Sequence, residues 1–162
     1  MPSYRFITEW RIEAPVERVW EVLADSQRWP QWWPSVRRVE QLEPGDDDGL
    51  GEVQRMTFVA KLPYQLRFDL RVIRRESPTV LVGEATGELE GTGEWTMREE
   101  DGWTSVRYVW AIRTTAPWIN LLAPLPFVSE IFGLNHHHAM RIGLKGIRRR
   151  LGGVAGRYTL IQ

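Results

Sequence analysis

Apolar and polar residues alternate with a period of two along five stretches of this chain. Three of the stretches are clear, and their apolar-side positions are Tyr4, Phe6, Thr8, Trp10 and Ile12; Tyr64, Leu66, Phe68, Leu70 and Val72; and Thr104, Val106, Tyr108, Trp110, Ile112 and Thr114. Successive side chains of a strand point to opposite faces. The pattern therefore predicts antiparallel strands with one apolar face.

The pattern predicts seven strands, at residues 4–13, 36–42, 51–60, 63–75, 79–88, 89–99 and 103–115. Asp101-Gly102 separates the last two, and this dipeptide is a strong signal for a two-residue hairpin turn. We expect short helices after the first strand, because Pro15 stands at a helix start and an apolar residue then recurs at helical spacing up to Leu23. A further short helix is expected at 118–122.

The last strongly apolar part of the chain changes to a helical period. It predicts a long helix from Phe127 or Val128 to Leu151, which Gly152-Gly153 ends. Its apolar face would carry Phe132, His136, Ala139, Met140, Gly143, Ile147 and Leu151. A sheet with one apolar face needs a partner, and this helix supplies it. We expect a cavity of a few hundred Å3 between them, the size class of ligand sites.

Residues 29–34 (Trp-Pro-Gln-Trp-Trp-Pro) concentrate aromatic rings between two prolines. We interpret them as a hydrophobic plug that closes one end of the sheet, with a lid that contacts ligand as the alternative. Gly91 and Gly93 alternate along one strand and have no third glycine and no following helix, which excludes a dinucleotide-binding motif. They indicate that something bulky lies against the strand, either the long helix or a ligand.

Composition narrows the function classes. The 21 basic and 21 acidic residues balance, so nothing draws the chain to nucleic acid. The absence of cysteine excludes disulfides and thiolate metal sites and fits a cytoplasmic protein, and the charged strand expected near the N-terminus leads us to expect no secretory signal. Prolines and polar residues interrupt the apolar segment 116–134, which argues against stable membrane insertion. At 162 residues we expect one domain over 1–153, with 154–162 a tail that is loose or packs back as a strand.

Three consecutive histidines, His136, His137 and His138, do not form a metal site, because successive helical residues point about 100° apart. We expect no metal and no cofactor. Only His136 shares the apolar face of the long helix. It is either a buried neutral histidine bonded to a carbonyl or tyrosine, or a cavity group that orients ligand or moves a proton, which makes it the candidate catalytic residue.

Several segments resemble one family. A strand followed by residues 14–20 (Ala-Pro-Val-Glu-Arg-Val-Trp) and 29–34 resembles the opening of the START-related SRPBCC superfamily. Segments 62–64, 87–91 and 93–95 are similar to its polyketide cyclase/dehydrase-like branch, as is Asn135-His136 leading to Met140, Gly143 and Gly146-Ile147. The resemblance runs from Ser3 to Leu151. It implies an α+β helix-grip fold, in which a seven-stranded curved antiparallel sheet wraps around a long C-terminal helix and leaves a hydrophobic pocket.

The leading hypothesis is a binding module that holds a small hydrophobic or aromatic ligand, lipid- or polyketide-like, between sheet and helix. The predicted ligand-binding residues are Thr8, Trp10, Tyr64, Phe68, Gly91, Gly93, Trp95, Tyr108, Trp110, Phe132, His136 and Met140. One alternative is a cyclase or dehydratase without cofactor. Another is a surface at 116–127 that touches a membrane or a partner. The sequence leaves a homodimer open.

Overall fold

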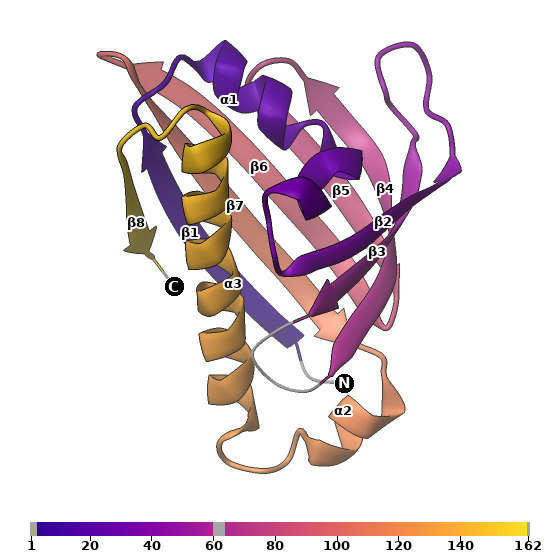
Figure 1. Ribbon diagram of the computed structural model, residues 1–162. Coiled ribbons are helices and arrows are strands. Elements are labelled where there is room, and N and C mark those ends of the chain that lie inside the picture. The colour runs from indigo at the N-terminus through magenta and orange to yellow at the C-terminus, as the bar shows by residue number, and fades with distance from the viewer. Residues whose placement is uncertain (1–2, 60–63, 162) are drawn as a thin grey trace.

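An eight-stranded antiparallel sheet in the order β2-β3-β4-β5-β6-β7-β1-β8 curves around one long helix (Figure 1). This computed structural model describes residues 3–59 and 64–161. The strands are β1 (Ser3–Ile12), β2 (Val36–Glu43), β3 (Val53–Val59), β4 (Gln65–Glu76), β5 (Val80–Gly87), β6 (Leu89–Glu100), β7 (Trp103–Thr114) and β8 (Gly156–Leu160). The predicted strand ends at Ala60 and Pro63 lie outside the described residues.

The helices occupy the predicted segments. α1 (Val16–Leu23) and the 3-10 helix η1 (Ser26–Gln31) follow β1, α2 (Pro117–Leu122) follows β7, and α3 (Val128–Arg150) crosses the concave face of the sheet (Figure 1). Pro15 caps α1 in an extended conformation, and Pro117 starts α2, where its missing N–H is harmless. The helix-grip architecture predicted from the resemblance is therefore confirmed.

The predicted strand number is wrong by one strand. Residues of the tail form β8, which pairs antiparallel with β1 so that Tyr158 lies opposite Trp10. A sheet of seven strands would leave this edge of β1 unpaired, and β8 satisfies those backbone groups. β8 is also held to α3, because the Tyr158 hydroxyl is hydrogen-bonded to Nδ1 of His137 at 2.8 Å. Of the two alternatives for the tail, the extra strand is correct.

The period-two pattern correctly assigns the two faces of β7. Thr104, Val106, Trp110, Ile112 and Thr114 are all buried on the concave face. The turn before this strand is also as predicted. Asp101 has φ 54° and Gly102 has φ 80°, the conformation that a two-residue hairpin requires at both central positions.

Tryptophan rings fill the core beneath α1, η1 and the C-terminal half of α3. Trp29, Trp32 and Trp33 are 4%, 7% and 2% exposed, as expected for a plug. The Trp33 ring stacks on Trp32 at 5.5 Å, and its Nε1 donates to the backbone oxygen of Ala139 at 2.9 Å. At about 25 cal/mol per Å2 and 150–250 Å2 per ring, each buried tryptophan contributes about 4–6 kcal/mol of transfer free energy.

Close packing of α3 depends on two glycines. A Cβ atom at Gly146 would stand 1.8 Å from the carbonyl oxygen of Trp32, and one at Gly143 would stand 2.7 Å from Cε2 of Trp33. Any side chain at either position would push the helix away from the tryptophan cluster. These contacts fix the distance between helix and sheet, and hence the space left farther along the helix.

Candidate functional site

A cavity of about 140 Å3 lies between the concave face of the sheet and α3. Its wall comes from β1, η1, β3 to β7 and the first half of α3, and most of it is aromatic or aliphatic. The volume is smaller than the few hundred Å3 predicted. The reason is the packing of large rings into the same space, including Trp33, Trp95 and Trp110, which also line the cavity.

Most of the predicted ligand-binding residues line this cavity. They are Tyr64, Phe68, Gly93, Trp95, Tyr108, Trp110, Phe132, His136 and Met140. They come from β4 or its start, β6, β7 and α3, so the fold brings together side chains that are far apart in sequence. Whether each contacts a ligand stays a prediction.

Thr8, Trp10 and Gly91 lie outside the cavity wall. Thr8 and Trp10 are 0% and 1% exposed, and Trp10 packs beneath Gly143 of α3, whose Cβ position lies 3.1 Å from the Trp10 ring. Gly91 has φ +143°, and a Cβ there would stand 2.1 Å from the backbone oxygen of Ala111. The bulky neighbour expected at Gly91 is thus the β7 backbone rather than α3 or a ligand.

One end of the cavity is polar, which the sequence analysis missed. Ser26, Glu52 and Gln54 line it there. Gln54 is 3% exposed, its Nε2 donates to Oε1 of Glu52 at 2.8 Å, and its Oε1 accepts a hydrogen bond from the Ser26 hydroxyl. The period-two pattern does indicate Gln54, because it precedes Met56 and Phe58 at two-residue spacing and therefore shares their inward face.

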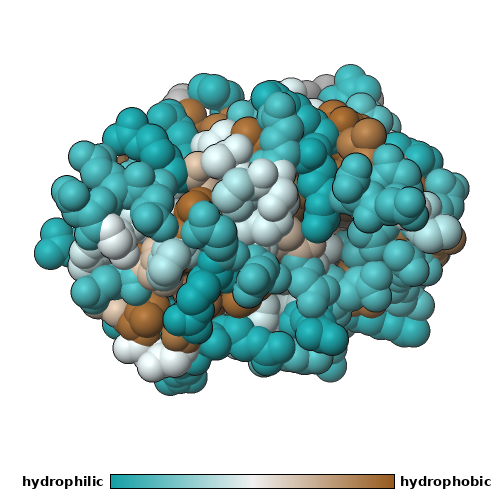
Figure 2. Space-filling model, turned by 90° about the horizontal axis from the view of Figure 1, so that it is seen from above, coloured by the Kyte–Doolittle hydropathy of each residue, from teal (hydrophilic) through white to brown (hydrophobic). Residues whose placement is uncertain are grey.

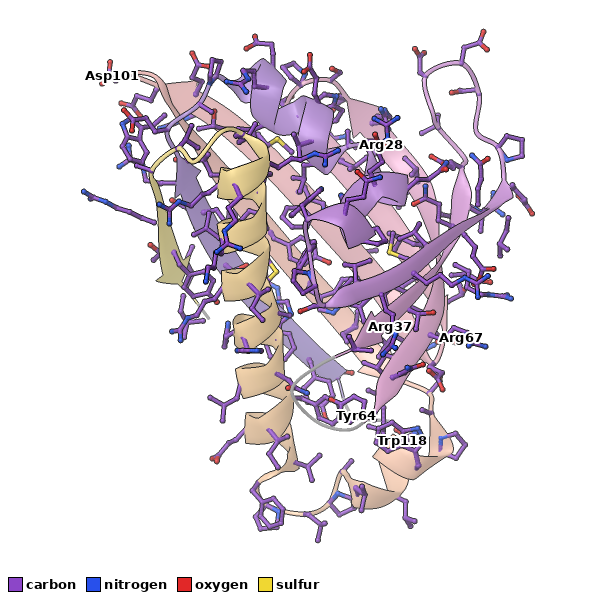
Figure 3. All side chains as sticks on the ribbon, viewed as in Figure 1. Arg28, Arg37, Tyr64, Arg67, Asp101 and Trp118 are labelled. Carbon is purple, nitrogen blue, oxygen red and sulfur yellow. The ribbon has the colours of Figure 1, made fainter. Side chains whose placement is uncertain are left out.

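The other end carries aromatic side chains around Tyr64. Its hydroxyl accepts a hydrogen bond from Nδ2 of Asn135 at 2.8 Å, and its ring lies 5.1 Å from Trp118 and 6.1 Å from Phe132 (Figure 3). Burial raises the pKa of Tyr64, although the bond from Asn135 opposes this. Asn135 was also missed, although it precedes His136 on the helix. Leu62 and Pro63, which precede Tyr64 in the segment 62–64 used for the family resemblance, lie outside the described residues.

An exposed apolar segment adjoins the Tyr64 end. Trp118, Leu121, Leu122, Leu125 and Phe127 are 39%, 79%, 44%, 44% and 53% exposed. The opposite end of the molecule carries mainly hydrophilic side chains (Figure 2). Within the described parts of the chain, no helix is both long and apolar enough to cross a membrane.

His136 lies in the cavity wall, and its Nε2 lacks, among the described residues, the carbonyl or tyrosine partner that the first of the two alternatives required. Its ring stacks on Phe6 with centroids 4.5 Å apart, and its fully enclosed Nε2 has no hydrogen-bond partner among residues 3–59 and 64–161. Burial, helped by the nearby His137, lowers the pKa of His136 from 6.5 to about 3. The histidine that bonds a tyrosine is His137, on Tyr158. His136 is therefore neutral near pH 7.

Tyr108 faces His136 across the cavity wall. The two rings are nearly parallel with centroids 6.2 Å apart, and Tyr108 also stacks on Trp95 at 4.0 Å. Burial raises the pKa of the Tyr108 hydroxyl well above its ordinary value, so the group keeps its proton. His136 and Tyr108 thus present uncharged polar atoms in otherwise aromatic surroundings.

Comparison with protein families settles the wider relationship. Residues 5–154 match a family described as polyketide cyclase/dehydrase and lipid transport. The chain belongs to this family. Other members of the polyketide cyclase/dehydrase family bind hydrophobic ligands or act as polyketide aromatase/cyclases. The predicted family resemblance is confirmed.

Solved structures share the fold. The Zhui aromatase/cyclase from Streptomyces sp. R1128 aligns with a TM-score of 0.71 at 22% identity, covering 94% of this chain and 100% of that one. A START superfamily protein from Mycobacterium smegmatis aligns with a TM-score of 0.71 at 14% identity, covering 92% and 98%. The di-domain ARO/CYC BexL aligns with a TM-score of 0.69 at 20% identity over 91% of this chain, which spans only 49% of that protein. No curated protein sequence matches the chain.

Proposed function

We propose that this protein binds a small hydrophobic or aromatic ligand in the cavity between the sheet and α3. The observation that carries the proposal is the largely apolar, ring-lined cavity of about 140 Å3. An apolar cavity of about 150 Å3 in a protein interior stays dry and binds benzene, so this space accepts a one-ring molecule as it stands.

The charge state of His136 favours binding over catalysis. A general base works best when its pKa lies near the working pH, and burial lowers the pKa of His136 to about 3. Such a histidine accepts a proton weakly near pH 7. A cyclase that relied on His136 would need a ligand or partner to raise this pKa. Binding needs no such change.

Methionine methyl groups supply the test, because the chain has 4 methionines. Met56 and Met140 line the cavity, whereas Met97 is buried outside it. We expect benzene, followed by NMR of 13C-labelled methionine methyls, to shift Met56 and Met140 in a saturable way and leave Met97 unchanged. Ala139→Phe places a ring in the cavity and should abolish the shifts, while the exposed Ala155→Phe should not.

Absence of saturable shifts in the folded protein, or equal shifts in the Ala139→Phe variant, would overturn the proposal. The natural ligand is sought separately. Native mass spectrometry of protein purified from its own host should find a retained small molecule, and the same filled-cavity variant should have lost it.

Contact with a lipid surface is a second candidate, favoured by the exposed apolar segment beside the Tyr64 end. Leu121 is 79% exposed there. We expect the protein to sediment with phosphatidylcholine vesicles and Leu121→Ser to weaken this, whereas serine at Leu42, 45% exposed on β2, should leave it unchanged. Equal sedimentation of the two variants would count against a role for this segment.

A further inference from the structure

The polar end of the cavity adjoins a second hollow, which lies at the surface. This hollow of about 580 Å3 is lined by the last turn of α1 and by residues 44–49, in the connection between β2 and β3. α1 lies at the opposite end of the molecule from α2 (Figure 1). Ala24, Glu52 and Arg75 line the hollow and the cavity alike. At these three residues, therefore, side chains separate the inside of the protein from its surface.

A β-bulge in β4 directs Arg75 toward the cavity. The pairing of β4 with β5 is regular from Phe68 to Val72, but Val72 and Arg74 then pair with consecutive residues of β5, so Ile73 is an extra residue. An extra residue in one strand reverses which of the following side chains face each side of the sheet. Arg75 consequently lines the cavity, as Val72 does, whereas Arg74 lines neither the cavity nor the hollow.

The Arg75 side chain reaches from β4 to two other elements. Its Cζ atom lies 5.5 Å from the centre of the Trp20 ring on α1. Its Nη1 atom lies 3.2 Å from the position that a Cβ at Gly49 would occupy. The ion pairs among residues 3–59 and 64–161 do not include Arg75. Because a cation–π contact at a partly exposed site is weak, this side chain can leave its position at little cost.

Glu52 fastens the elements beside Arg75. Its Oε1 atom accepts hydrogen bonds from the side-chain amides of Gln27 at 3.1 Å, Gln41 at 2.9 Å and Gln54 at 2.8 Å. The three donors belong to η1, β2 and β3. One carboxylate oxygen thus connects three elements around the boundary between the cavity and the hollow.

Of the three residues that line both spaces, Arg75 is the one whose side chain can move aside. Ala24 ends at Cβ, and Glu52 is held by its three amide donors. We propose that this boundary is a mouth of the cavity, and that ligand enters and leaves when Arg75 swings away from Trp20. The inference rests on the proposed function and adds the route of the ligand and the residue that controls it.

The rates of benzene exchange test the proposal. NMR line shapes of the Met56 and Met140 methyl groups, recorded at several benzene concentrations, give the association and dissociation rates. We expect Arg75→Ala to raise both rates at least about threefold, the value of one exposed cation–π contact, because a lower barrier speeds passage in both directions. Arg74→Ala makes the same change at the preceding position, outside both spaces, and should leave the rates unchanged.

Two further variants complete the test. Ala24→Leu adds bulk to the same boundary and should slow both rates. Arg75→Gln also removes the guanidinium, and it replaces the alanine variant if that protein does not fold.

The outcomes separate the two proposals. If benzene itself causes no saturable shift, the binding function fails. If benzene binds but exchanges at wild-type rates in Arg75→Ala and Arg75→Gln, the function stands and the mouth is overturned. Equal acceleration by Arg74→Ala, or exchange in Ala24→Leu that is as fast as in wild type, would also overturn the mouth.

Discussion

The buried neutral His136 makes stability depend on pH in a direction that can be worked out. Its pKa is about 3 in the folded protein against 6.5 when unperturbed. Between about pH 6.5 and about pH 3, His136 is therefore protonated in the unfolded chain but stays neutral in the folded protein. The free energy of unfolding consequently falls as the pH is lowered through this range. Each pH unit between these values is worth about 1.36 kcal/mol, so at about pH 5 the loss from this residue is about 2 kcal/mol.

Replacing His136 by phenylalanine removes this loss while keeping an aromatic ring in the stack with Phe6. We expect wild type to lose about 2 kcal/mol more than the variant between about pH 7.5 and about pH 5. Urea unfolding followed by tryptophan fluorescence measures the free energy at both pH values. His137, whose pKa burial also lowers, is present in both proteins and cancels in the comparison. His138→Phe is the matched control and should lose as much as wild type.

An equal loss in wild type and His136→Phe would refute the reasoning. It would mean that His136 is protonated as easily in the folded protein as in the unfolded chain, and hence that Nε2 reaches water or an acceptor. The measurement therefore bears on the site as well as on stability.

Two glycines provide further predictions. A Cβ at Gly93 would stand 2.8 Å from the Tyr108 hydroxyl, so Gly93→Val should destabilise the protein by about 1–3 kcal/mol and reduce benzene binding; an unchanged melting temperature with unchanged binding would contradict this. Gly146→Ala would place Cβ 1.8 Å from the Trp32 carbonyl oxygen and should lower the melting temperature sharply, whereas Gly133→Ala on the same helix has room and should stabilise by about 1 kcal/mol. Similar melting temperatures for these two alanine variants would show that α3 does not pack as closely as described.

Local patterns were sufficient for the elements of the fold. The period of two located the strands and correctly assigned the faces of β7, because side-chain direction in a strand depends only on the backbone. Asp101-Gly102 predicted its turn because both residues tolerate positive φ. The family resemblance added the helix-grip arrangement. It also brought an error, since the expected seven strands omitted β8.

The cavity depended on contacts between distant segments, which no local pattern contains. Alternation placed Thr8 and Trp10 on the inward face, yet α3 covers Trp10 at Gly143 and neither side chain reaches the cavity. The volume of about 140 Å3 is what remains after tryptophans from η1, β6 and β7 have packed into the space between sheet and helix. Whether His136 Nε2 has a partner was decided in the same way, by which atoms the folded chain brings near it. Close packing is a property of the whole set of neighbours, so the sequence pattern predicted a space between sheet and helix but neither its size nor its unsatisfied atom.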